Sequence, residues 1–136
     1  MAGYYEKSPA MIIQKGKKVK YNPLLMPIAG LLIYSMIIPV FILDIWTRIY
    51  QAIYFPINEI PKINRKDYVS FERWNLKKLT LWQKIDCVYC EYVNGTLAWA
   101  KAVGNQTEVY SCAIKHQFLA KPREHEKDFA DPSVYK

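Results

Sequence analysis

The sequence predicts a mainly α-helical protein that is anchored in a membrane near its N-terminus. Three observations predict this fold class. Residues 21–43 form an uncharged apolar run, residues 44–57 continue it with the pattern of an amphipathic helix, and a set of cysteines with one histidine follows at spacings typical of a small metal-stapled helical domain. Of the 136 residues, about 80 remain after residue 57, near the lower limit for a domain stabilised by its core alone.

The first segment, residues 1–20, is a basic N-terminal tail. It places four lysines directly before the apolar run, and the whole chain has a formal net charge of +7. This charge favours an anionic neighbour, for which membrane lipid is the simplest candidate. The chain has no glycine-rich phosphate loop, helix-turn-helix pattern or aromatic RNA-binding signature, so a nucleic-acid partner is not expected. We identify no small-molecule substrate and no catalytic set, and we do not expect an enzyme.

The second segment, residues 21–57, is the predicted membrane anchor. Its first 23 residues, YNPLLMPIAGLLIYSMIIPVFIL, would extend about 34 Å as a helix, compared with a hydrocarbon core of about 30 Å. Pro27 suits a first turn, whereas Pro39 should kink the helix. Lysines and arginines flank the run on both sides, so both a single span and a re-entrant helix are consistent with the charge pattern.

The end of the anchor, after Asp44, is predicted to be an interfacial amphipathic helix that ends at Pro56. Asp44, Thr47, Arg48 and Gln51 fall on its polar side. The apolar side is expected to face lipid headgroups or a protein partner, and it contains Ile45, Trp46, Ile49, Tyr50, Ile53 and Tyr54.

Three further segments follow the anchor. Residues 58–80 form a basic connector expected along the membrane surface, and residues 81–120 form the predicted Cys3His helical domain. Within that domain we expect a break at Asn94-Gly95, with Thr96 as the next helix cap, and a turn at Gly104-Asn105 before a third helix capped by Thr107. Residues 121–136 are a polar tail with little apolar surface to bury, which should be disordered on its own.

The candidate metal ligands are Cys87, Cys90, Cys112 and His116. The first two have the C-x2-C spacing of a chelating pair, and the last two, four residues apart, would share one side of a helical turn. Together they form a Cys3His set, typical of tetrahedral zinc. The odd number of cysteines disfavours a disulfide framework and favours a reducing compartment. The site requires the predicted break near Asn94-Gly95.

The identity of the ion leaves alternatives open. We favour zinc over iron, which would make the domain structural; iron at the same four ligands would make it a membrane-tethered, rubredoxin-like electron carrier. A three-ligand metalloenzyme with an open position is a third reading, and cysteines packed as small core side chains without metal are a fourth. Asp86, Glu91 and Glu108 are candidate hydrogen-bond partners for His116, and His125 is expected to be an ordinary surface residue.

Two segments, Trp82–Gly95 (WQKIDCVYCEYVNG) and Thr107–His116 (TEVYSCAIKH), resemble a family of short bacterial membrane-anchored proteins without an assigned role. The likeness covers residues 65–118 and implies a bacterial inner membrane. Together with the small size, it leads us to expect an accessory or assembly subunit of a larger inner-membrane protein complex. We expect the C-terminal region on the cytoplasmic side.

Overall fold

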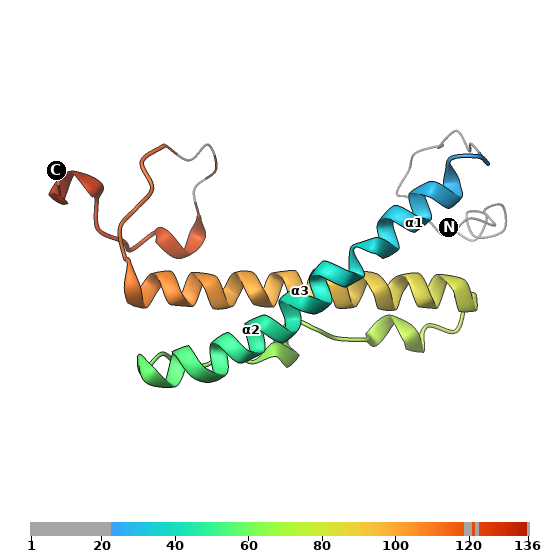
Figure 1. Cartoon of the computed structure of the whole chain (residues 1–136), viewed down its shortest axis with the longest axis horizontal. Helices are drawn as coiled ribbons and strands as arrows, with labels where there is room; N and C mark the ends of the chain where they lie inside the picture. Colours follow the sequence, from blue (N-terminus) through green and yellow to red (C-terminus); the bar gives the residue numbers. More distant parts are fainter. Residues whose placement is uncertain (1–22, 119–120, 122, 136) are drawn as a thin grey trace.

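The computed structural model describes residues 23–118, 121 and 123–135, so the predicted basic tail lies outside the described residues (Figure 1). Most of the described chain belongs to α1 (Met26–Ser35), α2 (Ile37–Ile57) and α3 (Leu81–Ser111). Four short 3-10 helices complete it: η2 (Arg65–Asp67), η3 (Glu72–Asn75), η4 (Glu124–Glu126) and η5 (Pro132–Tyr135). Within the described ranges the β-structure is limited to an isolated bridge between Ile114 and Ala130. The prediction of a mainly α-helical protein is confirmed.

The helices α1 and α2 together form a helical run from Met26 to Ile57 that is 32 residues long and apolar enough to cross a membrane. Pro27 lies in the first turn of α1, where a missing N–H costs nothing. The run is interrupted at Met36, one turn before Pro39. Since Pro39 cannot donate to the carbonyl of Ser35 and its ring crowds that carbonyl, the interruption follows directly from the sequence.

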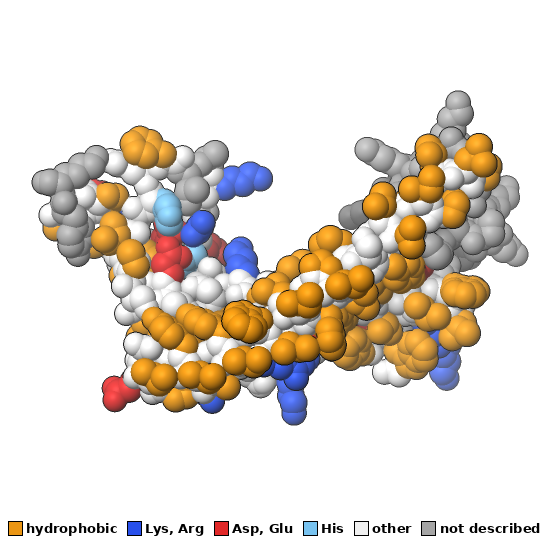
Figure 2. All heavy atoms as spheres, viewed as in Figure 1, with side chains coloured by type: hydrophobic (Ala, Val, Ile, Leu, Met, Phe, Trp, Pro, Cys, Tyr) orange, Lys and Arg blue, Asp and Glu red, His pale blue; other side chains and the backbone are white. Residues whose placement is uncertain are grey.

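The polar side of α2 faces the interior of the protein, and most of its apolar side faces outward. Asp44 and Thr47 are only 4% and 7% exposed. The Gln51 side chain donates to the carbonyl of Ile63 and accepts from its N–H, both at 3.1 Å. The exposed side chains of the predicted apolar side are Ile45, Trp46, Ile49 and Ile53. Figure 2 shows hydrophobic side chains in a band along α1 and α2.

Two residues of the predicted apolar side, Tyr50 and Tyr54, lie inward instead. Their rings stack at 5.0 Å, and their hydroxyls lie 2.9 Å from Thr107 Oγ1 and 3.4 Å from Ser111 Oγ, respectively, on α3. Both pack against the hydrophobic core, whose fully enclosed members are Phe55, Ile60, Trp99 and Val103. The core is therefore small, and it lies between the end of α2, the start of the connector and the second half of α3.

The connector, residues 58–80, turns back and runs along α3 towards its N-terminus. The Trp99 indole N–H donates to the carbonyl of Ile63 at 3.3 Å, and the Arg73 N–H donates to Glu91 Oε1 at 3.1 Å. At the start of α3, the Thr80 hydroxyl accepts from the Gln83 N–H while the Gln83 side chain accepts from the Thr80 N–H. This reciprocal pair is a capping box, and it sets the point where α3 begins.

The helix α3 is continuous for 31 residues, so the breaks predicted at Asn94-Gly95 and Gly104-Asn105 were wrong. Gly95 instead allows a close approach, since a Cβ there would lie 2.5 Å from the carbonyl oxygen of Tyr68 in the connector. Thr96 lies within α3 and is fully buried, and the Thr107 hydroxyl donates to the carbonyl of Val103 at 3.0 Å. Neither threonine is a helix cap.

An ion-pair network joins α2, the connector and α3 around the buried carboxylate of Asp44. Arg65 of the connector donates to both carboxylate oxygens, at 3.0 and 2.9 Å, and Arg48 donates from the next turn of α2 at 3.0 Å. The Tyr92 hydroxyl of α3 also donates to this carboxylate, at 3.1 Å. Asp44 therefore pairs with Arg48 one turn along α2 and also ties three segments together.

Candidate functional site

The four predicted metal ligands lie at opposite ends of α3. Cys87 and Cys90 are in its first third, whereas Cys112 directly follows its last residue and His116 lies beyond it. Twenty-five residues of continuous helix separate Cys87 from Cys112, which corresponds to about 37 Å. The structure therefore does not bring these four side chains around one ion within a single chain. The break that this site required is absent from α3.

The three cysteines differ in exposure, and one of them has a perturbed thiol. All three cysteines are free thiols; Cys87 is half-buried, whereas Cys90 and Cys112 are exposed. Although Cys90 is exposed in part, the surrounding protein partly desolvates its sulfur, and this desolvation, reinforced by the neighbouring Cys87, raises the pKa of the Cys90 thiol. A raised pKa disfavours the thiolate, which is the form that binds metals and attacks electrophiles.

Of the three carboxylates predicted to partner His116, only Glu108 lies near it. Asp86 accepts a hydrogen bond from the Tyr34 hydroxyl of α1. Glu91 accepts from the connector through Arg73. Glu108 Oε1 is 3.9 Å from His116 Nδ1. The first two carboxylates therefore serve the packing of α3, and the third belongs to a different cluster.

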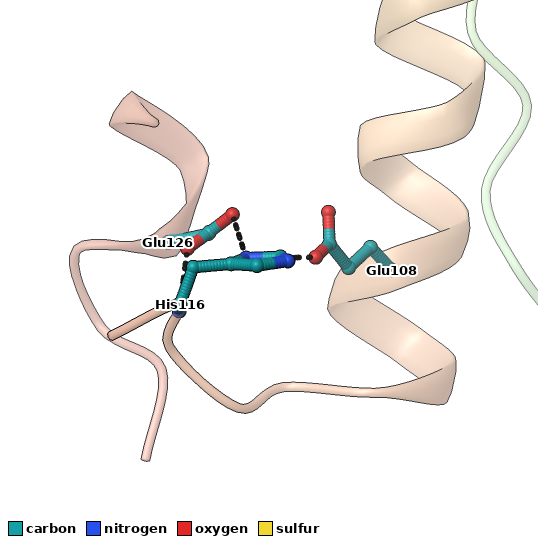
Figure 3. A group of neighbouring side chains, drawn as sticks. All are labelled: Glu108, His116 and Glu126. Carbon is teal, nitrogen blue, oxygen red and sulfur yellow. Dashed lines mark hydrogen bonds and ion pairs between the residues drawn. The ribbon is translucent and has the colours of Figure 1, made fainter. Parts of the chain in front are cut away.

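That cluster brings together Glu108, His116 and Glu126, which come from three separate segments (Figure 3). Glu108 lies in the last turn of α3, His116 in the segment after it, and Glu126 at the end of η4. His116 Nδ1 is 2.8 Å from Glu126 Oε1, and the backbone N–H of His116 donates to Glu126 Oε2 at 3.1 Å. One ligand atom from each residue lies within 4.8 Å of the others.

Two further side chains, His125 and Arg123, contact the carboxylates of this cluster. His125 Nε2 is 2.7 Å from Glu108 Oε2, and the guanidinium of Arg123 lies 3.6 Å from a carboxylate oxygen of both Glu108 and Glu126. The side chain of His125 is only 14% exposed, so it is not the ordinary surface residue that the sequence suggested. Both histidines of the chain thus belong to one cluster.

The backbone beyond α3 holds the cluster in position. Ala130 donates to the carbonyl of Ala113 and its own carbonyl accepts from Lys115, both at 2.9 Å. Phe129 is 7% exposed, and its ring meets the His125 ring edge-to-face at 5.7 Å. The described part of the predicted tail therefore packs against the end of α3, although its composition offers little apolar surface.

The buried carboxylate of Glu126 is stabilised in its charged form. Burial alone would raise its pKa, but hydrogen bonds from the backbone and ring of His116, together with Arg123, outweigh burial and lower it. With neutral imidazoles, two carboxylates and one guanidinium leave a net charge of −1 in the cluster. An ionised, partly buried carboxylate pair with imidazoles nearby is suited to binding a cation.

Sequence reasoning missed Glu126 and undervalued His125. The usable signal was that the only two histidines are nine residues apart, with glutamates on both sides of His125. Their polar surroundings indicated a solvated tail, and nothing in the local pattern showed that this tail folds back on α3.

Comparisons with protein-family models, curated proteins and solved structures found no match to this chain. The resemblance to short bacterial membrane-anchored proteins therefore stays a prediction.

Proposed function

We propose that this chain is an accessory subunit of a bacterial inner-membrane protein complex, anchored by the run from Met26 to Ile57. The observation on which the proposal depends is the exposure of this run. Only 17% of its most apolar stretch is buried within the fold. Burying a large aliphatic side chain is worth about 1.5–3 kcal/mol, so this surface would be strongly disfavoured in water.

Lipid is the occupant that best matches the outward surface. The charge-free stretch, residues 21–43, has the length of a bilayer core, and its described side chains include Leu24, Leu31 and Ile38, which are 80%, 74% and 63% exposed. Trp46, 69% exposed, follows the last uncharged residue by three positions, where an indole would reach the headgroup level. The first charges after this stretch, Asp44 and Arg48, form an ion pair.

The role as a subunit rests on different features. The chain is small, and neither its sequence motifs nor the neighbourhoods of its cysteines supply a catalytic set. A second exposed apolar group lies near the start of α3, beside the lysines of the connector; it consists of Phe71, Trp74, Leu81 and Trp82. This group would lie against a partner subunit or against the headgroups. The free thiols support a cytoplasmic location for α3, where disulfides are rare.

Membrane insertion is tested by a matched pair of substitutions. Leu32→Arg places a charge on the outward face in the middle of the charge-free stretch, whereas Ile57→Arg makes the same change at the end of the run, at 65% and 73% exposed positions. A central arginine costs about 2.5–3.5 kcal/mol of insertion free energy, and one at the end costs much less. We expect only Leu32→Arg to release the chain from membranes in alkaline carbonate. Release of the wild-type chain to the same extent as the central arginine variant would refute the membrane anchor.

Association with a complex is tested by extracting native membranes in mild detergent and determining the mass of the particle that contains this chain. A mass well above that of one 16.0 kDa chain and its micelle, with the same co-purifying proteins in independent preparations, supports the subunit role. A monomer would contradict it without affecting the anchor.

Sidedness is tested by labelling the exposed Cys112 in a chain with Cys87 and Cys90 replaced by serine. A membrane-impermeant maleimide should label Cys112 only after the cells are permeabilised. Labelling in intact cells would place the C-terminal region outside the cytoplasm.

A further inference from the structure

We propose that Glu108, His116 and Glu126 form a binding site for a divalent first-row transition-metal ion. This site shares only His116 with the predicted Cys3His set, and it is independent of the membrane proposal. Each of its ligands comes from a segment that the fold brings to the C-terminal end of α3 (Figure 3).

The geometry needs only a small contraction. In tetrahedral zinc sites with nitrogen and oxygen ligands, bonds of about 2.0–2.2 Å place ligand atoms about 3.4 Å apart. The three ligand atoms already lie within 4.8 Å of one another. The short His116–Glu126 hydrogen bond would open slightly, because the ion takes the place of the proton between Nδ1 and Oε1.

The chemistry of the donors defines the class of ion. Imidazole nitrogen favours zinc, iron and related ions over calcium and magnesium, while two carboxylates supply the charge that a divalent cation needs. His125, 2.7 Å from the second oxygen of Glu108, is placed as an outer partner that orients this carboxylate. Three protein ligands leave one tetrahedral position for water or for a group from a partner.

Arg123 is the competitor in this site. Its guanidinium lies 3.6 Å from both carboxylates, and its side chain is 45% exposed, so it can swing into solvent when an ion enters. If the cluster existed only to pair charges, removal of Arg123 would simply weaken it. If the cluster is a metal site, removal of Arg123 should strengthen metal binding. The two roles therefore predict opposite effects of this substitution.

The test uses the full chain in detergent with Co²⁺ as a visible probe and Zn²⁺ as the competitor. Because thiols also bind these ions, titrations are run with the wild type and with a variant that has all three cysteines replaced by serine. We expect stoichiometric binding in both, without the near-ultraviolet sulfur-to-cobalt absorption. Binding that disappears with the cysteines, or no saturable binding at all, overturns the proposal.

The ligands are tested by isosteric substitutions with a matched control. Glu108→Gln and Glu126→Gln should each weaken binding more than about tenfold, since even loss of an outer partner costs that much. Glu124→Gln makes the same change two residues from Glu126, at a side chain that is 92% exposed and pairs with Lys127. It should leave affinity unchanged, and Arg123→Gln should tighten binding. Equal affinity in all four variants overturns the proposal.

X-ray absorption at the zinc edge of the loaded wild-type chain covers the case in which a ligand variant fails to fold. Imidazole and oxygen scatterers without sulfur support the site. A sulfur shell would instead assign the ion to the cysteines and overturn the proposal.

Discussion

The two faces of the run from Met26 to Ile57 show opposite patterns. The inward face of α2 presents a carboxylate, a hydroxyl and an amide, each engaged or buried, whereas the outward face presents large apolar side chains. In water-soluble helical proteins the arrangement is usually the reverse. The difference shows that polar pairing, together with the core contacts of Phe55, Tyr50 and Tyr54, holds α2 against the rest of the chain, while its outward apolar surface remains available for lipid. Substitutions on the two faces should therefore affect different properties.

The largest effect is expected from Asp44→Ala on the inward face. This change leaves Arg65, whose side chain is only 25% exposed, without its counter-charge. Removing one partner of a buried pair costs about 3–5 kcal/mol, and the partial exposure of Arg65 places this case near the lower end. Chemical denaturation of the detergent-solubilised chain should show the loss. The double variant Asp44→Ala/Arg65→Met should recover part of the stability; no difference between the two variants would mean that the pair is not coupled.

A smaller effect is expected from Gly95→Ala, where the connector meets α3. The added Cβ would lie 2.5 Å from the Tyr68 carbonyl oxygen, so the backbone must shift, at a cost of about 1–3 kcal/mol. The matched control is Gly104→Ala in the same helix, where a Cβ meets nothing within 4 Å. The control should stabilise the chain by up to about 1 kcal/mol through helix propensity. The same sign for both variants in thermal unfolding would contradict the close approach.

Gln51→Ala should cost less again, about 1 kcal/mol, because it removes two neutral hydrogen bonds to the Ile63 backbone, and water can reach this half-buried site. Hydrogen exchange gives a local measurement. The Ile63 amide should lose protection in the variant, while amides in the middle of α3 keep theirs. Unchanged protection at Ile63 would show that the connector is held independently of α2.

The smallest effect on folding stability is expected from Ile49→Ser on the outward face. Ile49 is 45% exposed, so its truncation should change the unfolding free energy in detergent by no more than about 0.5 kcal/mol. The same variant should partition less strongly into lipid vesicles than the wild type. A loss of stability comparable to that of Asp44→Ala would mean that this face packs within the protein.

The long apolar helix was predictable because its signal is local. Length, absence of charge and the position of Pro39 together indicate a long apolar helix with an interruption, and residues 26–57 have that form. Which face of α2 turns inward was not predictable, because an amphipathic pattern identifies two faces without showing which one the rest of the protein covers. The inward position of Asp44 depends on Arg65, which is 21 residues away.

The four predicted metal ligands do not meet within the chain, because the helix break that we predicted at Asn94-Gly95 is absent. A glycine costs a helix only about 1 kcal/mol relative to alanine, so Asn94-Gly95 did not have to end α3. With α3 intact, the cysteines at its start cannot reach those at its end. The spacing of the four ligands along the sequence therefore suggested a single site, whereas the continuous helix keeps these ligands far apart.

The sequence by itself determined the helical class, the long apolar helical run and the start of α3 at the Thr80 capping box, since each depends on residues within a few turns of one another. Tertiary structure decided the continuity of α3, the inward polar face of α2 and the meeting of Glu108, His116 and Glu126. Those features arise from contacts between segments distant along the chain, and the free energy of such contacts is not encoded in any local pattern.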